Sequence, residues 1–207
     1  MDSTIIKEES LDEIGQQAGI GNEIKNITKK AMRGELDFKD ALISRIKLLN
    51  NYPVENIFKL NAKIRVNEGA KELVRKMKSK SCITVLISGG FSPSVSYVAK
   101  KLGFDYYHCN NFLYKKNNGR IVLNGCVLNP ILDKNSKLDI TKNYLKKFNL
   151  TLNDVISVGD GANDVNLIQH SGIGVSYQGK KILNRQADVI FNHTNLNGIL
   201  YLQNYRI

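Results

Sequence analysis

The sequence of 207 residues predicts an α/β fold, in which a parallel sheet is covered by helices and preceded by a helical segment. Two short apolar runs, CITVLI at 82–87 and DVISV at 154–158, are typical of buried strands, and helical patterns alternate with them. From about residue 10 to residue 78, apolar side chains recur instead at intervals of three and four residues. This change of period predicts a helical cap followed by an α/β core.

The helical segment contains four amphipathic stretches. They are LDEIGQQAGIG, EIKNITKKAMRG, FKDALISRIKLLN and KELVRKMKSK. Glycines end the first two stretches, and Pro53 separates the third from the residues that follow.

The core elements follow in order. The strand at 82–87 runs into Ser88-Gly89-Gly90, and a helix is expected over 95–102. Residues 106–128 are rich in β-formers and contain an Asn-Asn-Gly turn, which predicts a hairpin or flap. The remaining expected elements are a helix at 138–148, strands at 154–158, 174–177 and 187–191, and a short helix at 180–185. Ligands of such a sheet bind at the carboxyl ends of its strands.

Composition limits the function classes. The formal net charge is +11, but the lysines are dispersed in pairs, so solvated helix faces explain them better than a nucleic-acid partner does. A positive field also attracts a phosphorylated small molecule. Three scattered cysteines without CxxC spacing favour a reducing compartment. Acidic first residues, and the lack of an apolar run of about 20 residues, predict a soluble cytoplasmic protein with no membrane partner.

The stretch VGDGANDVNLI at 158–168 is the strongest chemical signal. Asp160 stands where an apolar strand ends, and Asp164 follows across small residues that permit a sharp turn. Two carboxylates in this arrangement can hold Mg²⁺ together with a substrate phosphate. Taken alone, the stretch is explained better by an ordinary Asp-Gly turn, with Asn163 or Asp164 capping a helix.

In the stretch LISGGF at 86–91, polar and small residues again follow directly after an apolar strand. Ser88 and the amides of Gly89 and Gly90 can donate hydrogen bonds to an anion such as phosphate. The alternative is a plain strand-to-helix turn, which glycines also serve.

Two cations are candidates for substrate contacts. Lys137 stands at the expected start of a helix, where its ammonium could neutralise a phosphoryl group, although most lysines are simply solvated. Arg45 lies beside an apolar helix face, where it could either extend along that face to water or bind a substrate carboxylate bidentately.

Taken together, MDST, LISGGF, Lys137 and GDGAND resemble the motifs of the haloacid-dehalogenase-like phosphohydrolases, in the same order. The segments DSTIIKEESLDEIGQQAG and KKAMRGELDFKDALISRIKLL are similar to the cap of the bacterial and archaeal phosphoserine phosphatase family. The resemblance covers almost the whole chain. It implies a Rossmann-like core at 1–9 and 66–207, a small helical cap at 10–65, and Mg²⁺-assisted hydrolysis through an aspartyl-phosphate intermediate.

The resemblance also implies roles in catalysis and metal binding. Asp2 resembles the general acid/base, and its backbone carbonyl resembles a metal ligand. Asp160 resembles the carboxylate ligand of the metal, and Asp164 supports the metal's water shell. Lys137 matches the lysine that steadies the nucleophile and the transferring phosphoryl group, and so also binds substrate.

The implied substrate contacts come from both parts of the chain. Ser88 and Gly89 match the phosphate-binding motif, and Asn163 falls on a substrate position of the fourth motif. Glu9 and Arg45 match the cap residues that bind the amino and carboxylate groups of phosphoserine. The expected apolar neighbours of these two residues are Met32 and Phe38.

One departure concerns the first motif. The family pattern is Asp-x-Asp-x-Thr, its first Asp is the nucleophile, and Met1 occupies the x. The chain as written therefore lacks the nucleophile and the apolar strand before it, and we expect a polypeptide starting at Met1 to be inactive, with exposed sheet edges. Three explanations are open: a start recorded from an internal methionine, a decayed gene product, or a non-catalytic ligand-binding remnant.

The expected function of the complete protein is hydrolysis of O-phosphoserine to serine and phosphate with Mg²⁺, the last step of serine biosynthesis. A related small-molecule phosphomonoesterase or phosphotransferase of the same superfamily is the first alternative. The second is an inactive protein that binds a phosphorylated ligand. The sequence predicts no oligomeric state.

Overall fold

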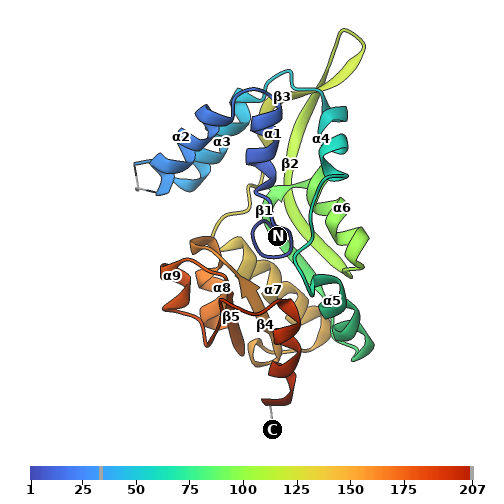
Figure 1. Ribbon diagram of the computed structural model, residues 1–207, viewed down its shortest axis with the longest axis vertical. Coiled ribbons are helices and arrows are strands. Elements are labelled where there is room, and N and C mark those ends of the chain that lie inside the picture. The colour runs from blue at the N-terminus through green and yellow to red at the C-terminus, as the bar shows by residue number, and fades with distance from the viewer. Residues whose placement is uncertain (33–34, 206–207) are drawn as a thin grey trace.

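The computed structural model describes residues 1–32 and 35–205, and its description of side chains leaves out Met32 and 203–205. The expected α/β class is confirmed: parallel strands alternate with helices. A helical layer lies above a core layer, and the N-terminus lies between the two (Figure 1).

The helical layer contains four helices. They are α1 (Ser10–Gln17), α2 (Gly21–Met32), α3 (Phe38–Leu48) and α4 (Val54–Asn61). The side chain of Asp37 accepts a hydrogen bond from the Lys39 amide at 2.9 Å, which caps the first turn of α3. Helix α4 was not predicted, because Pro53 was interpreted only as a separator, whereas it stands at the N-cap of this helix.

The strands form two separate three-stranded sheets instead of one. In the first, β1 (Val85–Phe91) pairs parallel with β2 (Tyr106–Asn117), which pairs antiparallel with β3 (Arg120–Leu128). The second is wholly parallel and contains β4 (Ile156–Gly159), β5 (Ile173–Tyr177) and β6 (Val189–Phe191). Within the described residues, β1 pairs only with β2 and β4 only with β5, so each sheet has one unpaired edge.

The core helices connect and cover these strands. They are α5 (Ala70–Ser79), α6 (Ser92–Leu102), α7 (Ser136–Phe148), α8 (Val165–His170) and α9 (Lys181–Asn184), with 3₁₀ turns at Leu152–Asp154, Ala162–Asp164 and Leu196–Tyr205. The first core strand was expected at 82–87 and lies at 85–91, so the Ser-Gly-Gly stretch belongs to the strand and not to a turn after it. Pro93 in the first turn of α6 is compatible with a helix start.

Apolar side chains gather in two clusters. One joins Met1, Ile5 and Ile6 to α5, α6 and the strands of both sheets. The other joins α1, α3 and α4 to Phe91, Phe112 and Leu123, and the rings of Phe91 and Phe112 stack at 3.9 Å. The hairpin of β2 and β3 thus shares a core with the helical layer, although it follows the predicted cap by some 40 residues (Figure 1).

Among the described residues, none of the helices combines the length and the apolar character that crossing a membrane requires.

Candidate active site

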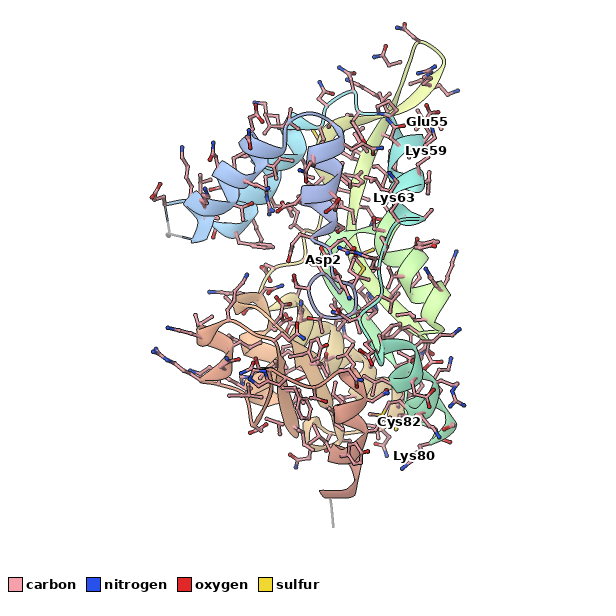
Figure 2. All side chains as sticks on the ribbon, in the orientation of Figure 1. Asp2, Glu55, Lys59, Lys63, Lys80 and Cys82 are labelled. Carbon is pink, nitrogen blue, oxygen red and sulfur yellow. The ribbon has the colours of Figure 1, made fainter. Side chains whose placement is uncertain are left out.

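All of the residues singled out for chemistry line one cavity of about 1040 Å³, except Met32, whose side chain is not among those described. It opens where β1 and β4 end, below the helical layer, and continues between the unpaired edges of these two strands. Figure 2 shows Asp2 at the level where the two layers meet. The lining residues predicted from the sequence are Asp2, Glu9, Phe38, Arg45, Ser88, Gly89, Lys137, Asp160, Asn163 and Asp164.

Asp164 and Lys137 form a buried ion pair at the floor of the cavity. Their side chains are only 8% and 9% exposed, and the Lys137 ammonium donates directly to Asp164 Oδ1. The amides of Asp160 and Gly161 donate to Asp164 Oδ2 at 3.2 Å each. Burial acts to raise the pKa of Asp164, but Lys137 and these hydrogen bonds hold it below its ordinary value. Asp164 is therefore an ionised anchor.

Gly159 leaves room for that carboxylate. A Cβ atom at this position would lie 2.4 Å from Asp164 Cγ, a separation that real Cβ atoms do not show. Position 159 therefore requires glycine, so that the Asp164 carboxylate can approach the backbone closely. The small residues around the two aspartates predict such a close approach.

Asp160 ends β4 and faces the same cavity. Its Oδ1 accepts a hydrogen bond from Thr4 Oγ1 at 2.9 Å. Burial, followed by the charge of Asp164, raises the pKa of Asp160. A carboxylate whose ionisation a neighbouring carboxylate disfavours is one that a divalent cation would favour, so Asp160 and Asp164 could together serve as donors to such an ion. Among the described residues, no group of three or more His, Cys, Asp or Glu side chains could hold a metal, so further ligands would be carbonyl, water or phosphate oxygens.

Asp2 lies in a tight turn at the edge of the cavity. Its Oδ2 accepts from Ser10 Oγ at 2.9 Å, whereas its buried Oδ1 has no hydrogen-bond partner. Burial is the largest cause that raises the pKa of Asp2 to about 6. Its backbone carbonyl, the expected metal ligand, accepts a hydrogen bond from the Thr4 amide at 2.7 Å and belongs to the turn in this structure.

The Met1 nitrogen is buried in the same place. Burial, and next the charge of Lys137, lower the pKa of this amine, and Asp2, Asp164 and Asp160 act in the opposite direction. A residue joined to that nitrogen would enter the cavity among these four side chains.

Ser88 and its glycines form the wall opposite the helical layer. Ser88 is 3% exposed, and its Oγ accepts a hydrogen bond from the Gly90 amide at 3.0 Å. The Gly90 amide was expected to face the ligand and instead serves this internal bond. Because Ser88 Oγ is the acceptor in this bond, the Ser88 hydroxyl can still donate its proton to another acceptor.

The helical layer contributes a cation and an anion. Arg45 of α3 is half-buried and donates through Nε to the Ala41 carbonyl at 3.2 Å, so part of its guanidinium is used within its own helix. Burial lowers the pKa of Arg45, while Asp12 and Glu9 act to raise it. Glu9 precedes α1 and accepts from Ser3 Oγ at 2.7 Å. The other expected apolar neighbour, Met32, lies outside the described side chains.

Comparison with known proteins agrees with this geometry. The model of the haloacid dehalogenase-like hydrolase family matches residues 1–169. The phosphoserine phosphatase of Methanocaldococcus jannaschii is 36% identical over 199 residues, which cover 96% of this chain and 92% of the relative. The chain belongs to this hydrolase family and to its phosphoserine phosphatase group.

Two further relatives support the assignment. The phosphoserine phosphatase of Archaeoglobus fulgidus is 38% identical over 96% of this chain, and the chain spans 57% of that relative's length. A solved structure of a substrate-bound phosphoserine phosphatase complex superposes with a TM-score of 0.88 at 35% identity, over 98% of this chain and 94% of the other. The predicted family and fold are confirmed.

Three polar residues of this hydrolase were not among the predicted site residues. Thr4 and Ser10 hold Asp160 and Asp2 in place, and Asn110 of β2 donates to the Gly89 carbonyl. The motif at the amino terminus contains Thr4, so its signal was available. Ser10 and Asn110 have no motif, and only the fold brings them to the site.

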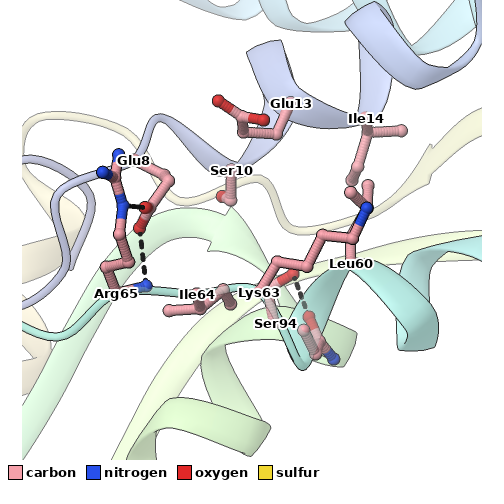
Figure 3. Close-up of a pocket in the computed structure, with 10 residues that line it drawn as sticks. Glu8, Ser10, Glu13, Ile14, Leu60, Lys63, Ile64, Arg65 and Ser94 are labelled. Atoms are coloured by element: carbon pink, nitrogen blue, oxygen red, sulfur yellow. Dashed lines mark hydrogen bonds and ion pairs between the residues drawn. The ribbon is translucent and has the colours of Figure 1, made fainter.

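A second pocket of about 200 Å³, lined in part by Ser10, lies at the crossing between the layers (Figure 3). Here Ile6 and Val66 form an isolated antiparallel bridge between the two connecting segments. Arg65 Nε also binds Glu8 Oε1 at 2.7 Å, and its backbone amide donates to Glu8 Oε2 at 3.1 Å. These contacts hold the two connections side by side.

Proposed function

We propose that the protein hydrolyses O-phosphoserine to serine and inorganic phosphate, as the last step of serine biosynthesis in the cytoplasm. The observation that supports this best is one cavity in which Glu9 and Arg45 lie on the helical side and Ser88 and Lys137 on the core side. This arrangement presents a carboxylate and a guanidinium for an amino acid head group, and donors for a phosphate. Residues 10–65 act as the cap, and residues 1–9 and 66–207 form the core.

Each residue has a role that its environment suits. In a form that carries an Asp directly before Met1, the carboxylate of that residue would attack phosphorus to form an aspartyl phosphate, and the serine oxygen would leave with its bonding electrons. Asp2, whose pKa is raised to about 6, donates a proton to that oxygen and later accepts one from the attacking water. Ser88 and Gly89 bind the phosphoryl oxygens, Lys137 offsets their charge, and Asn163 contacts the substrate from the 3₁₀ turn.

Magnesium fits the acidic side of this cavity. The charge of Asp164, which raises the pKa of Asp160, and the unpartnered Oδ1 of Asp2 support a site for a cation, which Asp160 and the Asp2 carbonyl would hold while Asp164 would support its water shell. When bound, Mg²⁺ supplies Lewis-acid polarisation of the phosphoryl group.

We also propose that a polypeptide starting at Met1 is inactive, because no carboxylate then precedes Met1. The cavity between the unpaired edges of β1 and β4 supports the expectation that the active form carries a further strand there. The test compares residues 1–207 with a version that carries an apolar segment ending in Asp directly before Met1. We expect Mg²⁺-dependent phosphate release only from the extended version, and ordinary turnover by the short version would contradict this.

The substrate is tested in the extended protein. Phosphate release from O-phosphoserine is compared with release from O-phosphothreonine and glucose 6-phosphate, and Arg45→Ala is compared with its exposed neighbour Lys47→Ala on the same helix. We expect selectivity for O-phosphoserine, which Arg45→Ala reduces and Lys47→Ala leaves unchanged. Equal turnover of the sugar phosphate would defeat the serine assignment in favour of a related phosphomonoesterase.

The second candidate is a binding protein for a phosphorylated ligand. For the polypeptide that starts at Met1, the ion pair between Lys137 and Asp164 favours it, because Lys137 has no carboxylate nucleophile to contact there. Calorimetric binding of O-phosphoserine by residues 1–207 without turnover, and an extended version that is also inactive, would support this function over catalysis.

A further inference from the structure

Asn110 is a buried carboxamide in the middle of β2, outside the cavity lining. Its residue is 1% exposed, and it lies opposite Phe91 in the parallel ladder, at the end of β1 that carries the Ser-Gly-Gly stretch. Its neighbour Asn111 is exposed, so only one of two consecutive asparagines is buried.

Both ends of the Asn110 carboxamide are hydrogen-bonded to backbone groups of different segments. Nδ2 donates to the Gly89 carbonyl at 2.8 Å, and Oδ1 accepts from the Leu132 amide at 2.8 Å. One partner is an acceptor and the other a donor, so a carboxamide satisfies both, whereas a carboxylate satisfies only Leu132.

The first bond fixes the phosphate-binding wall. The Gly89 carbonyl and the Gly90 amide belong to one planar peptide group, so holding the carbonyl also orients the amide. That amide donates to Ser88 Oγ at 3.0 Å. Asn110 thereby holds the peptide group whose amide donates to the Ser88 hydroxyl oxygen.

The second bond fixes the approach to Lys137. Leu132 is followed by Asp133, whose Oδ1 accepts from the amides of Asn135 and Ser136 at 3.0 Å each. This carboxylate holds the first turn of α7, where Lys137 is the second residue. Asn110 therefore ties the segment before Lys137 to the segment that carries Ser88.

We propose that Asn110 is a positioning residue that sets the Ser88 hydroxyl and the Gly89 peptide relative to Lys137 for binding of the phosphoryl group. The inference rests on the proposed function and assigns a residue to its phosphate side. Asn110 touches no substrate atom and acts through the peptide group between Gly89 and Gly90.

The test uses Asn110→Asp in the extended protein, with Asn111→Asp as the matched control. The first variant keeps the acceptor for Leu132 and replaces the donor to Gly89 by a repelling oxygen. Misplacement of reacting groups by about 1 Å costs on the order of 100-fold in rate, so we expect kcat to fall about 10- to 100-fold. We expect inhibition by inorganic phosphate to weaken about tenfold, and inhibition by serine, which contacts the cap, to change less than twofold.

A separate measurement tests the inference even if the extended protein is inactive. Inorganic phosphate is titrated into ¹⁵N-labelled residues 1–207 and into the same two variants, and the amide signals of 88–90 are followed. We expect Asn110→Asp to shift the Gly90 signal before any phosphate is added and to weaken the phosphate response, and Asn111→Asp to do neither.

Three outcomes decide the matter. Equal kinetics and equal Gly90 signals in the two variants would overturn the inference, even if O-phosphoserine is hydrolysed. Parallel loss of phosphate and serine inhibition with a lowered Tm would show that Asn110 merely stabilises the fold. If no phosphomonoester is hydrolysed while the Gly90 effects appear, the positioning role stands and the proposed function fails.

Discussion

Replacing Lys137 by methionine removes one partner of the ion pair that is most deeply buried among the described residues, and leaves Asp164 behind. The two side chains are 9% and 8% exposed, so little water can replace the lost ammonium. Removing one partner of such a pair typically costs 3–5 kcal/mol. The Asp160 and Gly161 amides still donate to Asp164 at 3.2 Å, so we expect the lower end, about 3 kcal/mol of unfolding free energy at pH 7.

This loss should depend on pH in a defined direction. In the unchanged protein Asp164 has a pKa below its ordinary value, so its contribution is present above that value and is lost as the pH falls. Without Lys137, burial raises the pKa of Asp164, and the folded variant gains stability as this carboxyl takes up a proton. The gap between the two proteins should therefore be widest near pH 7 and should narrow toward pH 4.

Urea denaturation in metal-free buffer at several pH values measures the gap. Asp164→Asn and the double variant complete a mutant cycle, in which we expect a coupling energy of about 1–3 kcal/mol, because the double variant leaves no buried charge unpaired. A cost below about 1 kcal/mol that does not change with pH would refute the argument, since it would mean that water reaches Asp164.

Three further changes have defined outcomes. Gly159→Ala should lower the rate of phosphate release in the extended protein at least tenfold, because its Cβ would lie 2.4 Å from Asp164 Cγ, and an unchanged rate would contradict this contact. Asp133→Ala should cost about 1 kcal/mol at pH 7 in urea denaturation, as helix caps do. Hydrogen bonding to Ser136 is the largest cause that lowers the pKa of Asp133 to about 2, so this cost should vanish as the pH falls from about 4 to about 2, and a cost that persists at pH 2 would count against it. Arg45→Lys should raise KM for O-phosphoserine on the order of tenfold and leave p-nitrophenyl phosphate less affected, and equal effects on the two would argue against recognition of the substrate carboxylate.

Sequence reasoning was successful where the chemistry is local. Asp160 and Asp164 are four residues apart on one turn, and Ser88 lies next to its glycines, so short sequence motifs are enough to identify them. Asn110 illustrates the opposite case. It stands beside Asn111 in a polar and aromatic strand, and alternation along a strand implies that one of the two faces inward without saying which. Only the pairing of β2 with β1 decides this.

The pairing of the strands into sheets was harder to predict than the fold class. Apolar runs identify strands but not their partners, so a single sheet was expected where two lie. Residues 106–128 were expected to form a hairpin or flap, and they form the β2–β3 hairpin. Its packing was not predicted: the Leu123 amide donates to the Tyr52 carbonyl at 2.9 Å and the Asn51 amide to the Leu123 carbonyl at 2.8 Å. These contacts join residues some 70 positions apart, which no local pattern reveals.

The same packing bears on how the cavity would select the proposed substrate by its length. Phe91 follows Gly90 directly, and it stacks on Phe112 inside the cluster that contains Leu42 and Ile46 on either side of Arg45. The wall proposed to bind phosphate and the helix proposed to bind the amino acid carboxylate therefore rest on one apolar core. Because packed cores resist changes of even one methylene, the separation between the two binding regions is fixed by packing and not by the flexible side chains alone. A monoester with a longer backbone would have to break that core to reach both ends, which gives a physical basis for selectivity toward a small phosphorylated amino acid.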